Sequence, residues 1–399
     1  MTYSFQDLTN GNVYTDTQAD QTEVNIRDHV HGANGVAELT GNHTLAGVWT
    51  FQSGISANGW VAASSYASFN LARAAATSAN KTLIVDVTST MTANDTVPST
   101  TPIFPIYPGV IVSNGYTLTI NGPVVGNPMH QWLSGFAGGD GAANFDLKFG
   151  VGTINSIRPE WFGAKGNNST DCTSAFNIAF LVAGCSNYAV SDAGYFYDYG
   201  FEIVMVNGIY RVTATSGNFA ITAKTGMSGV SPKHTHIYNV GTGSALKTFS
   251  GYFSVYRNFA VIGTSSSEDG IVLDTSGGTA GIKYANMSGV ESKYHGRHGL
   301  VHRSSWATNY YDCEFSENKG LGIYVTAEGG QGSANGVTFL NCNASHNGGA
   351  SASVTFNDDK GGVKIEGAAV VNFIGGIYEY NNAWDFIIAK SNSYPTRVL

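Results

Sequence analysis

A loose internal repeat in the C-terminal part of the chain constrains the fold more than any other feature of the sequence. Five segments align on anchor positions that are separated by 30, 24, 29 and 34 residues. The anchors are Phe259, Gly289, Cys313, Cys342 and Gly376. Twelve positions further on, each segment has a β-branched residue, and these are Ile271, Val301, Val325, Val354 and Ile388. Such a column is typical of a solenoid interior, because neighbouring coils lie about 4.8 Å apart and similar side chains interlock.

Asparagine recurs at a second aligned position, five residues after the anchor, in the last three segments. Stacked at a turn, Asn318, Asn347 and Asn381 can form a ladder of side-chain amides. Cys313 and Cys342 then lie one above the other as a buried thiol pair rather than as a reactive site. The repeat therefore predicts an all-β protein built on a single-stranded parallel β-helix.

The overall composition agrees with many short strands and tight turns. The chain has 50 Gly among 399 residues, and only 12% of its residues are charged. Its net charge of −8 argues against nucleic acid as a partner, because little would neutralise the phosphates. No apolar run has the length of a membrane span, and the N-terminus does not resemble a signal peptide. We therefore expect that the protein does not insert into a membrane. We also expect that it assembles in the cytoplasm.

Three regions follow one another along the chain. Residues 1–60 are polar and Gly-rich and bury too little to fold alone, so they are either flexible or stabilised by other copies of the chain. Residues 61–157 read as a small β-rich domain, and residues 158–399 as the parallel β-helix. A helix at 171–183, with an apolar stripe and a possible cap at Thr170 or Asp171, is expected at the start of the β-helix.

The small domain carries two local signals. Residues 66–76 have the composition of a short helix. The strand-like runs 110–112 and 116–120 flank Ser113-Asn114-Gly115, a sequence that is typical of a hairpin turn. A hairpin is therefore predicted here.

The segment RPEWFGAKGNNSTDCTSAFNIAFLVAG (158–184) resembles the motif at which β-helices of the pectate-lyase superfamily begin. Asn167-Asn168 stands where the family has Asp-Gly, and Asp171-Cys172 where it has two Asp. Residues 83–126 are similar to the stretch that precedes this motif in phage and bacterial relatives. The resemblance implies a right-handed coil with a capping helix at its N-terminal end.

Residues 27–32 (RDHVHG) and 39–51 (LTGNHTLAGVWTF) are similar to phage tail-fibre sequences. The resemblance implies a homotrimer that binds, and often cleaves, bacterial surface polysaccharide. It predicts a tail fibre or tailspike subunit, located in the virion tail, for host recognition and adsorption. Other tail proteins would bind its N-terminal segment and the C-terminal end of its solenoid. Two alternatives remain open: a polysaccharide depolymerase of the same fold, and a bacterial or prophage-derived surface protein.

His29 and His31 form the sharpest local motif of the sequence. In a strand, residues i and i+2 point to the same side, so three copies on a threefold axis would present about six imidazoles. That number suits octahedral iron or a similar divalent metal. An ordinary polar pair in a loop is the alternative, and both stay open.

One predicted coil concentrates cationic residues in an otherwise acidic protein. These residues are Lys293, His295, Arg297, His298, His302 and Arg303. A lyase acting on uronic acids needs a cation for the carboxylate and a base for the α-proton, and this set can supply both. Binding of sugars or anions, or a subunit contact that involves Glu314 and Glu317, would use the same residues.

A glycoside hydrolase needs two carboxylates, about 5 Å apart for retention and about 6.5–9.5 Å apart for inversion. In the alignment above, no row contains two acids; the row after the anchor holds Ala260, Val290, Glu314, Asn343 and Ile377. Diagonal pairs of Glu291 with Glu314, or of Glu314 with Glu317, remain possible. The alignment thus favours virion architecture over catalysis.

Overall fold

The structure is a computed structural model, and its compact parts are two units, residues 1–52 and 53–399. The residues it describes are 3–6, 13–16, 59–126, 128–137, 146–185, 190–192, 195–197, 201–223, 225–248, 254–273, 285–303, 307–326, 334–349, 359–368 and 370–389. In the first unit, β1 (Tyr3–Gln6) pairs with β2 (Val13–Asp16) in antiparallel orientation. The predicted metal ligands His29 and His31 lie outside the described residues.

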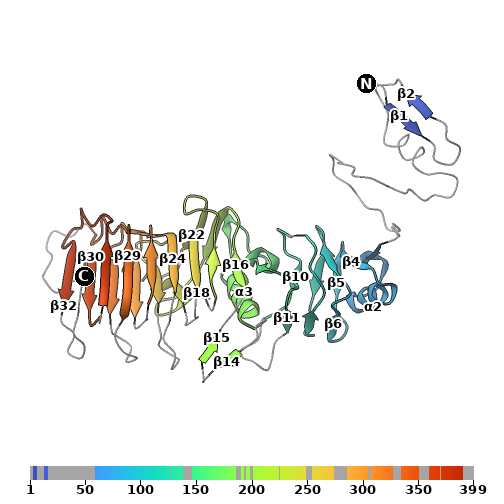
Figure 1. Cartoon of the computed structure of the whole chain (residues 1–399), viewed down its shortest axis with the longest axis horizontal. Coiled ribbons are helices and arrows are strands. Elements are labelled where there is room, and N and C mark those ends of the chain that lie inside the picture. The colour runs from blue at the N-terminus through green and yellow to red at the C-terminus, as the bar shows by residue number, and fades with distance from the viewer. Residues whose placement is uncertain are drawn as a thin grey trace. The chain divides into compact units, whose positions relative to one another are not determined.

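The second unit begins with three small parallel sheets and a helix (Figure 1). Their strands are β3 (Trp60–Ala62), β4 (Thr82–Val85) and β7 (Ile103–Pro105); β5 (Thr88–Thr90), β8 (Val110–Val112) and β10 (Leu133–Ser134); and β6 (Asp95–Val97), β9 (Leu118–Ile120) and β11 (Leu147–Phe149). The chain visits the three sheets in turn, so this region is itself a short coil. Helix α2 (Phe69–Ala79) confirms the predicted helix; the Ser68 hydroxyl accepts a hydrogen bond from its first turn, and Asn80 ends it.

The predicted hairpin is wrong. β8 and β9 belong to different sheets, and each pairs only with parallel strands of neighbouring coils. The turn signal is real, because Asn114 and Gly115 both have positive φ angles. Here, however, it turns the chain through a corner of the coil, so that Ile111 and Leu118 are both buried in the core.

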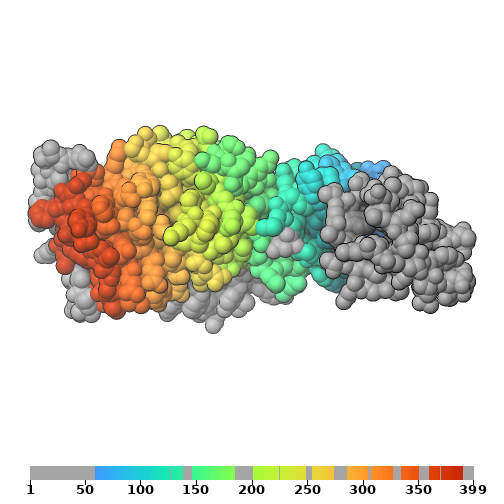
Figure 2. All heavy atoms as spheres, turned by 90° about the horizontal axis from the view of Figure 1, so that it is seen from above, coloured from blue at the N-terminus to red at the C-terminus, as the bar shows by residue number. Residues whose placement is uncertain are grey.

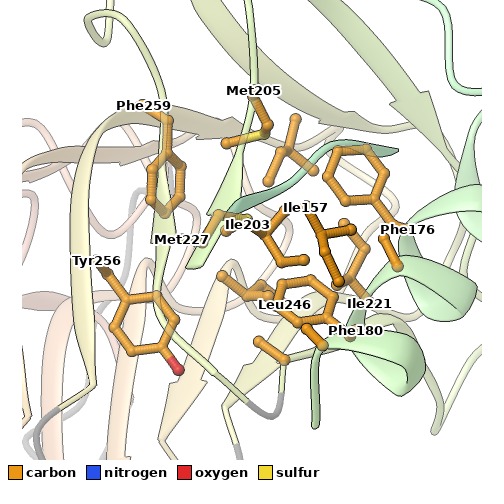
Figure 3. Packing of buried hydrophobic residues seen from close by; sticks show 14 of the residues in the cluster. Ile157, Phe176, Phe180, Ile203, Met205, Ile221, Met227, Leu246, Tyr256 and Phe259 are labelled. Carbon is orange, nitrogen blue, oxygen red and sulfur yellow. The ribbon is translucent and has the colours of Figure 1, made fainter. Parts of the chain in front are cut away.

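Helix α3 (Thr173–Cys185) lies where the larger solenoid begins and contacts β11 on one side and β18 on the other. The Asp171 carboxylate accepts a hydrogen bond from the Thr173 amide, as expected for a cap. Phe176 and Phe180 of this helix point into the core (Figure 3). The predicted helix is therefore confirmed. Around it lie β12 (Ser156–Ile157), the 3-10 helix η2 (Pro159–Phe162), β13 (Asn167–Asp171), and the antiparallel pair β14 (Val190–Asp192) and β15 (Tyr195–Tyr197).

The rest of the second unit is a parallel β-helix with two long sheets. The first contains β12, β13, β16 (Glu202–Val204), β17 (Gly208–Val212), β19 (Met227–Ser228), β20 (Thr235–Asn239), β22 (Val255–Ile262), β24 (Asn286–Lys293), β26 (Asn309–Tyr311), β27 (Glu314–Ser316), β29 (Asn335–Leu340) and β31 (Val370–Ile374). The second contains β18 (Phe219–Ala223), β21 (Ser244–Thr248), β23 (Ile271–Leu273), β25 (Leu300–Arg303), β28 (Leu321–Thr326), β30 (Gly361–Glu366) and β32 (Phe386–Ala389). Successive coils follow one another in chain order (Figure 2).

The predicted register is correct for four of the five segments and wrong by one residue in the segment anchored on Gly289. Cys313, Cys342 and Gly376 are in register, because each precedes a residue of the aligned series Glu314, Asn343 and Ile377. Phe259, however, pairs with Val290 rather than with Gly289. Gly289 instead lies opposite Asn258 at a corner, and both residues have left-handed conformations, with φ of 57° and 61°.

The predicted β-branched column is also wrong. Val301 pairs with Tyr324, whereas Val325 pairs with His302, so the proposed row mixes neighbouring columns. Val354 lies outside the described residues.

The amide ladder is confirmed. The Asn347 side-chain oxygen accepts from the Asn318 amide at 3.0 Å, and the Asn381 side-chain oxygen accepts from the Asn347 amide at 2.9 Å. With the corrected register, His295 heads the ladder and donates its backbone N–H to Asn318 at 3.0 Å. Each amide therefore satisfies the backbone of the preceding coil.

Stacked side chains fill the interior. Tyr310 and Phe339 lie nearly parallel with ring centroids 4.5 Å apart, and Phe373 continues the stack at 4.8 Å from Phe339. Cys313 and Cys342 are buried free thiols, as predicted for an interior column. Desolvation raises the pKa of the Cys313 thiol, which keeps it protonated and unreactive.

Candidate functional site

Two corners of the β-helix are lined by residues in the left-handed conformation. At the first corner the residues are Asn258, Gly289, Asp312, Asn341 and Gly375. These types tolerate positive φ well. At the second corner they are Tyr294, Glu317, His346 and Tyr380, with φ of 64°, 60°, 59° and 57°. Bulky residues are uncommon in this conformation, which costs about 1–2 kcal/mol for a residue with a Cβ. Because strained residues cluster at functional sites, the second corner is a candidate functional site.

A pair of carboxylates lies between the two corners. Glu291 of β24 and Glu314 of β27 are direct partners in neighbouring coils, and both are half-buried. The Lys293 ammonium lies between them, 3.0 Å from Glu291 and 2.9 Å from Glu314. The expectation that no row contains two acids is therefore wrong, because the one-residue shift at Gly289 replaces Val290 by Glu291 in this row.

The second corner adds exposed aromatic rings beside the carboxylates. The Tyr294 hydroxyl donates to Glu317 at 3.1 Å, and 46% of Tyr294 is exposed. The His346 and Tyr380 rings stack with centroids 5.4 Å apart, and 70% of Tyr380 is exposed. We call the surface formed by these residues the Glu–Tyr face. Its members are Glu291, Lys293, Tyr294, Glu314, Glu317, His346 and Tyr380.

Ion pairs determine the protonation states on this face. Partial burial alone would lower the pKa of Lys293, but its hydrogen bonds to Glu314 and Glu291 outweigh burial and raise the pKa. Desolvation and the neighbouring Glu317 carboxylate raise the pKa of the Tyr294 phenol. At neutral pH the face therefore presents a charged lysine and neutral phenols.

The structure divides the six predicted binding residues among different environments. His295, His298 and His302 are buried, with exposed fractions of 0%, 5% and 0%. Desolvation lowers the pKa of these imidazoles to about 4, about 4 and about 3, so all three are neutral near pH 7. Buried side chains cannot contact a ligand on the surface.

Each buried histidine instead has an internal partner. His295 Nε2 lies 3.3 Å from the Val261 carbonyl oxygen. His298 Nδ1 accepts the Leu321 amide at 3.0 Å. His302 Nδ1 lies 2.7 Å from the Tyr310 hydroxyl. These three histidines connect neighbouring coils.

The three other predicted residues occupy separate places. Arg297 is half-exposed and forms a two-pronged ion pair with the buried Asp269, at 2.8 Å between Nε and Oδ1. Arg303 is half-buried on β25. Only Lys293 belongs to the Glu–Tyr face.

This arrangement can accept hydrogen bonds and stack on rings. Glu291 and Glu314 lie on neighbouring coils, whose backbones are about 4.8 Å apart, and retaining glycosidases hold their two carboxyl groups about 5 Å apart. Among the described residues, no group of three or more His, Cys, Asp or Glu is placed to hold a metal ion. No helix in the described part of the chain is long and apolar enough to cross a membrane.

No model of a protein family matches the chain, and no curated protein matches it. Solved structures that are similar include ORF18 of Geobacillus virus E2, with 15% identity over 55% of this chain and 52% of that one, at a TM-score of 0.40. The A-module of mannuronan C-5 epimerase AlgE6 from Azotobacter vinelandii has 17% identity over 58% of this chain and 66% of that one, at a TM-score of 0.38. The chain thus spans less than two thirds of either structure. Tailspike protein 2 of the Escherichia coli O157:H7 bacteriophage CAB120 has 9% identity over 86% of this chain and 42% of that one, at a TM-score of 0.23.

Proposed function

We propose that this protein is the subunit of a homotrimeric phage tail fibre or tailspike that recognises polysaccharide on the bacterial surface. The resemblance of 158–184 to pectate-lyase-like β-helices and of 39–51 to tail fibres supports this function. The coil would be right-handed, as nearly all crossovers between parallel strands are.

The Glu–Tyr face is the observation that carries the proposal. Sugar rings have apolar faces that stack on Tyr and hydroxyl groups that donate hydrogen bonds to carboxylates. Tyr294 and Tyr380 offer exposed rings beside three carboxylates, on a sheet that other coils hold rigid. Binding residues on a rigid scaffold lose little entropy when a ligand binds.

The N-terminal 60 residues would trimerise and attach the protein to the particle. Three copies of His29 and His31 would hold an iron or similar divalent ion on the threefold axis. A second tail protein would bind at the C-terminal end of the solenoid. The protein would therefore work in the virion tail.

Binding and size measurements test this function. The full-length protein should retain purified capsule or lipopolysaccharide from a susceptible bacterium, and light scattering should give three times the 42.0 kDa chain mass. Metal analysis should find metal in the wild type and none in a variant with both His29→Ala and His31→Ala. A stable monomer, or retention of no polysaccharide across a broad panel, would contradict the proposal.

A second function, that of a polysaccharide depolymerase, is favoured by the register of Glu291 and Glu314. Their spacing suits a retaining hydrolase. Such an enzyme would release new reducing ends from the bound polysaccharide, and Glu291→Gln or Glu314→Gln would abolish the release. A lyase would instead release unsaturated ends. Intact polysaccharide after long incubation would leave recognition as the function.

A further inference from the structure

We infer that the Glu–Tyr face selects glycans by charge: it takes chains whose sugars are uncharged or carry free amines, and it rejects uronate-rich chains. This inference rests on the proposed function, because it names the class of ligand for that face. The basic coil in the sequence suggested the opposite preference, for uronic acids, but the structure buries its three histidines.

The formal charges of the face favour a neutral or cationic ligand. Glu291, Glu314 and Glu317 contribute three negative charges, and Lys293 contributes one positive charge. Glu379 lies two coils beyond Glu317, immediately before Tyr380. A uronate laid on this face would meet like charges, which oppose its binding.

Lys293 cannot serve as a free binding site for a carboxylate. Its ammonium already contacts two carboxylates, and only 17% of its side chain is exposed. A ligand carboxylate would have to displace Glu291 or Glu314 from it. Lys293 therefore reduces the repulsion between the two glutamates and fixes their positions.

The two cations that follow the second corner in the chain have hydrogen-bond partners of their own. The Arg297 guanidinium is held by both oxygens of Asp269. The Lys319 ammonium donates to the Ser265 carbonyl oxygen at 3.1 Å. Both lie beyond the second corner, so a chain along the Glu–Tyr face would meet the carboxylates first.

The aromatic residues indicate that the ligand is a glycan chain rather than a small cation. Tyr294, Glu317, His346 and Tyr380 occupy equivalent positions on four successive coils, so the corner repeats one side chain per coil. A chain of sugar rings parallel to the solenoid axis can stack on Tyr294 and Tyr380 and donate hydroxyl or amine hydrogens to the carboxylates between them.

An array of purified bacterial polysaccharides tests the inference. Full-length protein is titrated against amino-bearing, neutral and uronate-containing members of comparable chain length. We expect the amino-bearing and neutral members to bind about tenfold more tightly than the uronates, as facing like charges imply. Tightest binding to the uronates would overturn the inference and leave the proposed function standing. Binding to none would overturn both.

A comparison of two variants identifies the face. The double variant Glu291→Gln, Glu314→Gln should bind amino-bearing glycans about tenfold more weakly, the loss expected for two exposed ion pairs. Glu202→Gln removes a carboxylate that pairs with Arg257 on an earlier coil, and should change nothing. Added salt should weaken binding of amino-bearing glycans to the wild type, a result that needs no variant. Equal losses in both variants, or binding that salt leaves unchanged, would overturn the assignment.

Discussion

Tyr294 illustrates the backbone strain of single residues at the second corner. Its φ of 64° is one that Asn adopts readily and an aromatic residue does not. We predict that Tyr294→Asn raises the free energy of unfolding by about 0.5–1 kcal/mol, since the new residue relieves backbone strain and loses one exposed hydrogen bond. The same variant should bind glycan more weakly. Chemical denaturation and a binding titration check both effects.

The first corner provides the matched control. Asn341 lies at the first corner and has a similar left-handed conformation, with φ of 54°. Asn341→Tyr should therefore lower the free energy of unfolding by about 1 kcal/mol. If Tyr294→Asn proved destabilising while Asn341→Tyr was neutral, strain at the second corner would be ruled out.

Asn347 carries the centre of the amide ladder. It is fully buried, accepts from Asn318 and donates to Asn381 at 3.1 Å and to the Phe315 carbonyl at 3.0 Å. We predict that Asn347→Ala lowers the free energy of unfolding by about 2–4 kcal/mol, because several buried partners lose their hydrogen bonds. Asn382→Ala, at an exposed neighbour, should cost less than about 1 kcal/mol. Equal effects in thermal denaturation would contradict the ladder.

The sequence predicted the ladder, and it named Glu291 and Glu314 only as a possible diagonal pair, whereas the structure places them in one row. Asn318, Asn347 and Asn381 repeat the same residue type, so the sequence displays their alignment. The pairing of Glu291 with Glu314 depends on a corner at Gly289 whose partner is Asn258. Gly, Asn or Asp recurs at the first corner in each of the five aligned segments, at Asn258, Gly289, Asp312, Asn341 and Gly375. Aligning these residues would have given the correct register of the coils.

At the scale of elements, the segment that joins β24 to β25 carries two buried histidines and β25 a third. Their pKa values of about 4, about 4 and about 3 in the folded protein lie below the value of about 6.5 expected in the unfolded chain. The unfolded chain therefore binds more protons below pH 6.5. Folding stability is complete above about pH 6.5 and falls as the pH drops towards 4, by on the order of 3 kcal/mol for each histidine.

Urea unfolding at a series of pH values checks this prediction. The free energy of unfolding should fall steeply between about pH 6.5 and pH 4. His302→Gln, which keeps a polar group near Tyr310, should make the fall about a third shallower. A free energy that stays constant down to pH 4.5 would contradict the burial of these imidazoles.

Elements were predicted best where local signals decide them. Both helices have caps and apolar positions that act within the segment, at Ser68 for α2 and at Asp171 for α3. The hairpin failed because Ser113-Asn114-Gly115 suits several corners, and only contacts with neighbouring coils select one. Turn chemistry thus predicts where the chain bends, and packing decides what the bend connects.

At the scale of the whole molecule, the parallel β-helix makes the Glu–Tyr face a rigid surface. Its side chains come from coils that hydrogen bonds, the amide ladder and the aromatic stack connect to one another. A trimer would present three such faces on one particle, and multivalent binding to a bacterial surface would far exceed the affinity of each face. We therefore expect trimers to adsorb to cells much more tightly than any single-chain fragment that folds.

Calorimetric titration of the bound polysaccharide into Tyr380→Ala and Tyr107→Ala variants tests the account most directly. Both tyrosines are exposed, by 70% and 81%, but only Tyr380 belongs to the Glu–Tyr face. We predict that Tyr380→Ala weakens binding about tenfold through the loss of a stacking surface, and that Tyr107→Ala binds like the wild type. Equal affinity of the wild type and both variants would contradict the central claim that this face binds glycan.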